Sequence, residues 1–236
     1  MRIVQCFGAT EKEVESGKFN IWIGISLGNK YFTKENIKEY ILWALENTKE
    51  NVLIVVGDRL YAIKLEALDK YNKMRAFQVA ARFGDKKEQE VNEIIEELPK
   101  EKRGLVKIAR FRQVTDTKYY EARLGVLRDG YKNNEEFREC VINIVKDIYG
   151  KSIHTLTDEV IDKLAEYVLI ELPVYLNGAY YHDSGKTGKY YECTLYPGLG
   201  LIDELIIGLH NGSLFPEIAK KLKLHNQIVI IEGYAN

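Results

Sequence analysis

Apolar and polar positions alternate near the start of the chain and then give way to a turn rich in glycine. Phe19, Ile21 and Ile23 are separated by single residues, which is the period of a strand with one buried face. The strand would end at residues 24–29, GISLGN, where glycines permit backbone conformations that side chains forbid. Ser26 would then be presented at the end of a buried strand as a nucleophile, or it is an incidental serine in a turn.

A helix and a second strand follow this turn. Thr33 is a good helix cap, and apolar residues recur at helical spacing from Ile37 to Leu45. Residues 51–57, NVLIVVG, form a continuous apolar run, which is typical of a strand buried on both faces. Strand, helix and strand in this order predict a βαβ unit with parallel strands. Ligands bind beyond the carboxyl ends of such strands, where Ser26 and Gly57 both fall.

The rest of the chain continues to alternate between helical and strand patterns. A helix opening at Thr157 should end at Leu172, because proline disfavours helical backbone in the residue before it. The other expected elements are a helix over residues 65–98, continuous or broken at Gly84, a strand over 105–109, helices over 118–128 and 135–149, a loop or hairpin over 177–188, a strand over 189–196, a helix over 199–209 and a strand over 227–233. We expect an α/β fold with a mostly parallel sheet, and one domain over residues 1–236.

Composition narrows the class of protein. Charged residues make up 29% and hydrophobic ones 46%, as in an ordinary globular protein. Three cysteines without C-x-x-C spacing argue against disulfides and zinc, and the four histidines, His154, His182, His210 and His225, are too scattered for a metal site. No signal peptide or membrane span is evident. We therefore expect a cytoplasmic monomer without a metal or cofactor.

A basic segment is hidden within a net charge of only -1. Between residues 70 and 87 the only acid is Asp85, while the bases are Lys70, Lys73, Arg75, Arg82, Lys86 and Lys87. Arg75, Arg82 and Lys86 would share one helix face. Such a face is commonly just solvated, but it also fits a polyanion such as RNA.

Tyr167 and Glu171 are four residues apart and should share one face of their helix. If the helix ends directly afterwards, its dipole would raise the pKa of Glu171, which suits proton transfer near neutral pH. The alternative is a core tyrosine beside a surface acid.

Three motifs together resemble those of the cyclodipeptide synthases, which join the amino acids of two aminoacyl-tRNAs into a cyclic dipeptide. They are G-I-S-x-G-N-x-Y-F at residues 24–32, Y-V-L-x-E-x-P at residues 167–173 and the pair Tyr196-Pro197. The resemblance implies an α/β, Rossmann-like three-layer fold, similar to the catalytic domain of the tyrosyl and tryptophanyl type of class I aminoacyl-tRNA synthetase. Because HIGH-like, KMSKS-like and phosphate-loop motifs are absent from the sequence, activation by ATP is not expected.

The resemblance also implies a ping-pong mechanism. Ser26 would carry the aminoacyl and then the dipeptidyl group, Tyr167 and Glu171 would hold the amino group, with Glu171 also a candidate to move protons, and Tyr196 would assist ring closure as a proton relay. The substrate-binding positions would be Gly24, Asn29, Gly57 and Pro197. The first tRNA would bind the basic segment, which comprises Lys70, Lys73, Arg75, Arg82, Lys86 and Lys87.

The sequence offers more than one tyrosine for the step of ring closure. One group of the family has Asn three residues after the serine and a later Tyr-His pair, and the other has Tyr-Pro, whereas this chain combines Asn29 with Tyr196-Pro197. The pair Tyr181-His182 lies closer to Glu171 than in the family, and Tyr191 is a further candidate.

Two other functions compete with this interpretation. Residues 24–28 also match the G-x-S-x-G elbow of α/β-hydrolases, but too little chain precedes Ser26 for the strands of that fold. A non-enzymatic RNA-binding domain would need only the basic segment and aromatic residues such as Phe77 and Phe83. It would leave the Ser26 turn unexplained.

Overall fold

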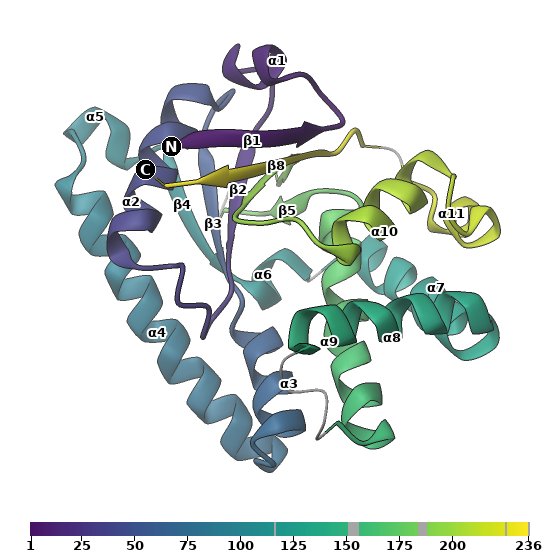
Figure 1. Ribbon diagram of the computed structural model, residues 1–236. Coiled ribbons are helices and arrows are strands. Elements are labelled where there is room, and N and C mark those ends of the chain that lie inside the picture. Colours follow the sequence, from purple (N-terminus) through teal and green to yellow (C-terminus); the bar gives the residue numbers. More distant parts are fainter. Residues whose placement is uncertain (116, 151–155, 184–187, 225, 236) are drawn as a thin grey trace.

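A central sheet organises the computed structural model, which describes residues 1–115, 117–150, 156–183, 188–224 and 226–235 (Figure 1). In the described residues its strand order is β1-β8-β7-β2-β3-β4. The strands are β1 (Arg2–Phe7), β2 (Ile21–Ile25), β3 (Val52–Val56), β4 (Val106–Arg110), β7 (Cys193–Tyr196) and β8 (Val229–Tyr234). Among the described strands of this central sheet, only β1 runs antiparallel to its neighbour, β8. The predicted α/β fold with a mostly parallel sheet is confirmed.

Helices cover both faces of this sheet and make three layers (Figure 1). Residues of β2 alternate between two separate cores, with Ile21 and Ile23 in one and Trp22 in the other. The first core is completed by α1 (Glu11–Glu15), α2 (Lys34–Asn47) and the C-terminal half of α4 (Lys73–Glu97). The second core is completed by α3 (Asp58–Leu68), α6 (Phe111–Thr115), α7 (Lys118–Asn133), α8 (Glu135–Tyr149), α9 (Asp158–Tyr175), α10 (Leu201–Asn211) and α11 (Pro216–Leu222). The short α5 (Lys100–Arg103) follows α4.

The long helix expected over residues 65–98 is two helices, and the break does not fall at Gly84. Helix α3 ends at Leu68, Lys70 has a left-handed φ of 53°, and the Asn72 side chain caps α4. Gly84 is buried in the middle of α4, where a Cβ atom would overlap the guanidinium of Arg110. Its lack of a side chain makes room for Arg110 and does not interrupt the helix.

Arg110 ties the end of β4 to two helices. Its guanidinium donates to Glu88 of α4 at 2.8 Å and contacts Asp58 of α3 at 3.3 Å. It also pairs with Asp85, the lone acid of the basic segment. The side chains of Arg110 and Asp58 are only 18% and 21% exposed, so the pair between them is weakly screened, whereas Glu88 and Asp85 are more exposed. Together these contacts connect α3 and α4 at the edge of the sheet.

Helix α9 also differs from the prediction, since it continues through Pro173 to Tyr175. The Leu176 amide still donates to the Leu172 carbonyl at 2.9 Å, so the last turn survives the proline. Leu172, Pro173 and Val174 are buried, and this packing outweighs the local preference of the residue before proline.

Other boundaries were partly wrong. The edge strand β1 was not predicted, because its residues are largely exposed and lack a long apolar pattern. The strand expected over residues 189–196 is two strands. Strand β6 (Lys189–Tyr191) pairs with β5 (Ala179–Tyr181) as a hairpin, while β7 joins the central sheet.

Some of the residues named in the sequence analysis lie outside the part of the chain that the structure describes. His154 and His225 lie outside the described residues, as does part of the loop over residues 177–188. Among the helices of the described segments, we find none with both the length and the apolar character needed to cross a membrane.

We predict that Gly84→Ala lowers the free energy of unfolding by about 2 kcal/mol, because the new methyl group displaces a partly shielded guanidinium from its carboxylates. Gly125→Ala is the matched control, since Gly125 also lies inside a helix but has no atom within 4 Å of a built Cβ. It should stabilise the protein by about 0.5–1 kcal/mol. Urea unfolding of both variants tests this, and equal effects would contradict the role of Gly84.

Candidate active site

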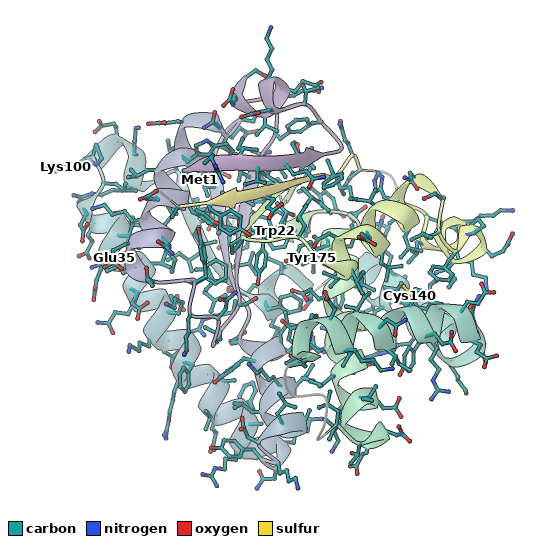
Figure 2. All side chains as sticks on the ribbon, viewed as in Figure 1. Met1, Trp22, Glu35, Lys100, Cys140 and Tyr175 are labelled. Carbon is teal, nitrogen blue, oxygen red and sulfur yellow. The ribbon has the colours of Figure 1, made fainter. Side chains whose placement is uncertain are left out.

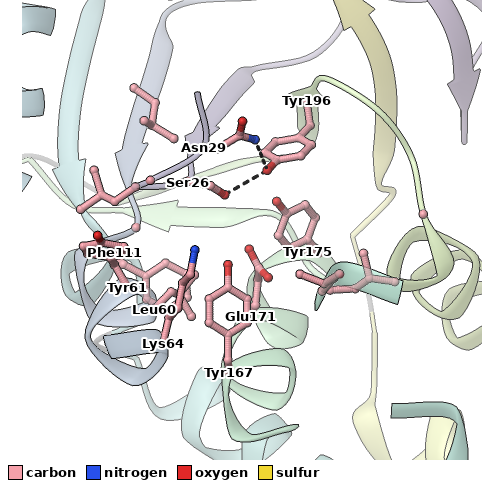
Figure 3. A pocket seen from close by; sticks show the side chains of 18 of the residues that line it. Ser26, Asn29, Leu60, Tyr61, Lys64, Phe111, Tyr167, Glu171, Tyr175 and Tyr196 are labelled. Carbon is pink, nitrogen blue, oxygen red and sulfur yellow. Dashed lines mark hydrogen bonds between the residues drawn. The ribbon is translucent and has the colours of Figure 1, made fainter. Parts of the chain in front are cut away.

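A cavity of about 470 Å³ lies at the carboxyl ends of β2 and β3 (Figure 3). Its walls come from the turn after β2, the start of α3, the middle and end of α9 and the segment after β7. Gly24, Ser26, Asn29 and Gly57 are among the lining residues, as the parallel sheet predicts.

The Ser26 hydroxyl lies beside the hydroxyl of Tyr196, with 3.0 Å between the two oxygens (Figure 3). Either oxygen can donate this hydrogen bond. Asn29 donates to the same Tyr196 hydroxyl at 3.5 Å, and the Phe32 ring packs on the Tyr196 ring with centroids 5.6 Å apart. The contact arises because β2 and β7 are parallel neighbours, with Ile23 opposite Leu195.

Helix α9 presents three polar side chains to the cavity from one face. Tyr167, Glu171 and Tyr175 are spaced by four residues and point toward Ser26 (Figure 3). Tyr175 packs edge-on against Trp22 at 5.0 Å between centroids, near the middle of the molecule (Figure 2). Sequence reasoning missed Tyr175 because it ended the helix at Leu172, before Pro173, although the spacing of four continues to Tyr175.

Burial dominates the electrostatics of this face. The pKa of Glu171 rises to about 8, first because burial disfavours its charged form and second because Asp203 is nearby. The direction predicted for Glu171 is correct, but the helix dipole is not its cause, since α9 extends beyond Glu171. Burial raises the pKa values of Tyr167, Tyr175 and Tyr196 as well, and a charge on Glu171 adds to each rise.

The other candidate tyrosines lie elsewhere. The Tyr191 hydroxyl is 2.5 Å from the Asn51 side-chain oxygen, and Tyr191 is not among the residues that line the cavity. Tyr181, in the hairpin opposite Lys189, is not among them either. Pro197 follows Tyr196 directly but does not line the cavity, in contrast to the three other predicted substrate-binding positions.

The basic segment lies outside the cavity, along the start of α4. Its exposed members are Lys70, Lys73, Arg75, Arg82 and Lys86. Arg75 stacks on the ring of Tyr71, 4.3 Å from its centroid. Lys87 does not belong to this exposed face, because its ammonium donates to the Phe32 carbonyl at 2.9 Å and pairs with Glu90. It braces the end of the Ser26 turn.

Sequence reasoning also missed several residues of the cavity wall. Tyr61 and Lys64 are three residues apart in the helix that follows Gly57, so helical periodicity places them on one face of α3. Asp203 lines the cavity and caps α10 by accepting from the Gly200 amide at 2.9 Å. Tyr149, at the end of α8, had no sequence signal that linked it to the site.

Comparison with known proteins now decides the family. The family model described as "Cyclodipeptide synthase" matches residues 4–187, which is most of the chain. The chain belongs to the cyclodipeptide synthase family. It is therefore an enzyme of the aminoacyltransferase type, which forms cyclic dipeptides from aminoacyl-tRNAs. This assignment replaces the serine-hydrolase and non-enzymatic RNA-binding alternatives.

Individual cyclodipeptide synthases are distant in sequence and similar in fold. A relative from Staphylococcus haemolyticus (strain JCSC1435), named "Cyclo(L-leucyl-L-leucyl) synthase", is 22% identical over 200 residues, which are 82% of this chain and 83% of the relative. The crystal structure of a synthase from Bacillus thermoamylovorans has a TM-score of 0.73 and 22% identity, over 96% of this chain and 93% of that one. A synthase from Candidatus Glomeribacter gigasporarum, solved bound to Phe-tRNAPhe, has a TM-score of 0.59 and 15% identity, over 92% and 88% of the two chains.

The predicted likeness of this synthase fold to class I aminoacyl-tRNA synthetases is also confirmed. A tyrosyl-tRNA synthetase from Archaeoglobus fulgidus matches with a TM-score of 0.52 and 9% identity. The match covers 94% of this chain and 57% of that one, so the likeness is to part of the synthetase.

We predict that Glu171 makes the stability of this synthase fall as pH rises toward 8. The unfolded carboxyl ionises near 4.5 and the folded one near 8, so between these values the folded chain keeps a proton that the unfolded chain has lost. The free energy of unfolding should fall by up to about 1.4 kcal/mol per pH unit from this group. For Glu171→Gln, the free energy of unfolding should fall less steeply with pH between about pH 7 and 8, a window above most of the titration of Asp203, whose pKa is about 6.

Urea unfolding at a series of pH values measures this slope. Glu96→Gln, which removes an exposed carboxylate of α4, controls for the loss of one charge and should keep the slope of the unmodified protein. Identical slopes for Glu171→Gln and the unmodified protein would mean that Glu171 ionises normally in the folded state.

Proposed function

We propose that this synthase works by a ping-pong mechanism through esters on Ser26. The observation that carries the proposal is that one cavity holds a serine hydroxyl 3.0 Å from a tyrosine hydroxyl and a carboxyl group with a pKa of about 8. The serine can act as a nucleophile, the carboxyl group can exchange protons near neutral pH, and the tyrosine hydroxyl can relay a proton through its hydrogen bond to the serine.

In the first half-reaction, the Ser26 oxygen attacks the ester carbonyl of the first aminoacyl-tRNA. A new ester forms on Ser26, the bond to the terminal ribose oxygen breaks, and the serine proton ends on that oxygen. The contact between Ser26 and Tyr196 supports a relay of this proton through the tyrosine hydroxyl. The energy of the original ester is retained in the aminoacyl-enzyme, so the step needs no ATP.

In the second half-reaction, Tyr167 and Glu171 hold the amino group of the aminoacyl-enzyme. In its ionised form, Glu171, with a pKa of about 8, can accept a proton from this ammonium and free the lone pair of the amine. The amine attacks the ester carbonyl of the second aminoacyl-tRNA, an amide bond forms, the bond from that carbonyl to the terminal ribose oxygen breaks, and the second tRNA leaves with a proton on this oxygen. The new amino terminus then attacks the Ser26 ester. This closes the six-membered ring, and Tyr196 returns a proton to the serine oxygen.

The lining of the cavity supports apolar amino acids as substrates. Its inner wall is formed by Trp22, Val55, Leu60 and Phe111. The relative from Staphylococcus haemolyticus is named for two leucyl groups, so leucyl-tRNA is the substrate that we would test first. Because aminoacyl-tRNA is the substrate, we place the reaction in the cytoplasm.

The exposed basic face of α4 is proposed to hold the first tRNA. Asp85 is engaged by Arg110, which leaves the neighbouring bases Arg75, Arg82 and Lys86 without an acid in their own segment. Positive charge on one exposed helix face suits phosphate groups. The related synthase solved with Phe-tRNAPhe supports tRNA as the polyanion.

We predict that Ser26→Ala lowers formation of cyclic dipeptide by about a thousandfold or more, since no ester can form. Tyr196→Phe should slow it by about a hundredfold, and dipeptidyl-enzyme should accumulate if ring closure depends on the relay more than the first transfer does. Mass spectrometry of the products and of the intact protein measures both effects.

Tyr191→Phe is the matched control, because the Tyr191 hydroxyl contacts Asn51 outside the cavity. It should keep nearly normal turnover and should not accumulate the dipeptidyl-enzyme. If Ser26→Ala turned over at the normal rate, the covalent route would be wrong.

We predict that a triple reversal, Arg75→Glu, Arg82→Glu and Lys86→Glu, lowers kcat/KM for leucyl-tRNA and weakens its dependence on salt. The slope of log affinity against log salt should become shallower by about 0.9 for each phosphate group that the variant no longer neutralises. The control reverses three exposed lysines on other segments, Lys12, Lys49 and Lys100, and so changes the net charge equally. Equal effects of the two triple variants would show that only net charge matters.

A further inference from the structure

An aminoacyl-tRNA that binds along α4 has to deliver its ester to Ser26 inside the cavity. Its unpaired 3′ end must therefore pass over the protein surface between the exposed face of α4 and the cavity. Helix α3 lies there, packed against α4 through a small core of Ala62, Leu65, Ala76 and Ala80. The side chains along this path are those that the last nucleotide would meet.

Two aromatic rings mark the path from α4 to the cavity. Phe83 of α4 is 49% exposed, and its ring lies 5.5 Å from the ring of Tyr61 of α3, between centroids. Tyr61 lines the cavity and lies against Gly28 of the Ser26 turn, where a built Cβ would come within 3.1 Å of the Tyr61 ring. One face of the pair is thus open to solvent, and the other touches the turn that holds the nucleophile.

An ammonium group stands next to these rings. Lys64 lines the cavity, with its nitrogen 6.0 Å from the centroid of Tyr61 and 5.9 Å from that of Tyr149 (Figure 3). Within the described part of the chain, no carboxylate forms an ion pair with it, although Lys34, Lys38 and Lys87 all have such partners. Cation–π contacts orient this charge without neutralising it, so it remains available to an anion.

We propose that Phe83, Tyr61 and Lys64 form the binding site for the 3′-terminal nucleotide of the tRNA, on the assumption that the proposed function is correct. The terminal base stacks on the exposed Phe83 ring, and the phosphodiester before it pairs with Lys64. Aromatic rings stack on single-stranded bases, and a lysine ammonium binds phosphate as a point charge. The terminal ribose then lies at the cavity mouth, beside the Ser26 turn.

The test measures what the terminal nucleotide adds to the affinity for uncharged tRNA(Leu). The affinity of the intact tRNA is compared with that of the same tRNA lacking its last adenosine and the attached phosphate. For the unmodified protein, we expect the intact tRNA to bind about tenfold more tightly. Phe83→Leu and Lys64→Gln should reduce this ratio to less than about twofold, because each variant removes one side of the site.

Matched variants separate this site from general effects. Phe77→Leu removes another phenylalanine of α4, which is 63% exposed and has no ring contact with a cavity residue in the described chain, and should keep the full ratio. Phe83→Tyr and Lys64→Arg should restore it, since they keep the ring and the charge. Lys64→Gln should also lower the salt slope for intact tRNA by about 0.7.

The proposal is overturned if the ratio is the same in every variant, or if Phe77→Leu loses it as fully as Phe83→Leu. A ratio of one in the unmodified protein would overturn it too. Uncharged tRNA forms no ester, so these outcomes are independent of the mechanism at Ser26. Failure of both tRNAs to bind would instead count against the proposed tRNA face on α4.

Discussion

The parallel pairing of β2 with β7 is the constraint on which the candidate site depends. It places Ile23 opposite Leu195, so the two strands end together and bring Ser26 to 3.0 Å from Tyr196. These residues are 170 positions apart in the chain. Their contact depends on the position of β7 between β2 and β8 in the sheet. Asn29 and Phe32, which follow Ser26 in the chain, also contact Tyr196 and fix its position.

The second requirement is a buried wall for that pair, and α9 supplies it. Continuation of the helix through Pro173 lets Tyr175 pack on Trp22 and closes the cavity beneath Gly24. Burial within this wall also raises the pKa of Glu171. A carboxyl group that would be an ordinary acid at an exposed helix end thus becomes a group that exchanges protons near neutral pH.

The proposed tRNA face is joined to this site by specific contacts. Lys87 reaches from α4 to the Phe32 carbonyl at the end of the Ser26 turn, and Arg110 clamps α3 and α4 to the end of β4. Both side chains carry positive charge, but both form ion pairs with carboxylates of the protein itself. Helix α4 therefore uses the partly buried charge of Lys87 to position the turn, whereas its exposed charges form the face that we propose for tRNA.

By itself, the sequence determined the parallel sheet, the position of Ser26 at the end of its strand and the shared face of Tyr167 and Glu171. Those features depend on periodicity and on residues close together in the chain, which a pattern can show. Tertiary structure alone decided which tyrosine meets Ser26, that Tyr175 joins the cavity and that Lys87 is not part of the exposed basic face. Each of these follows from contacts between distant segments, whose packing overrides local preference, as at Pro173 and Gly84.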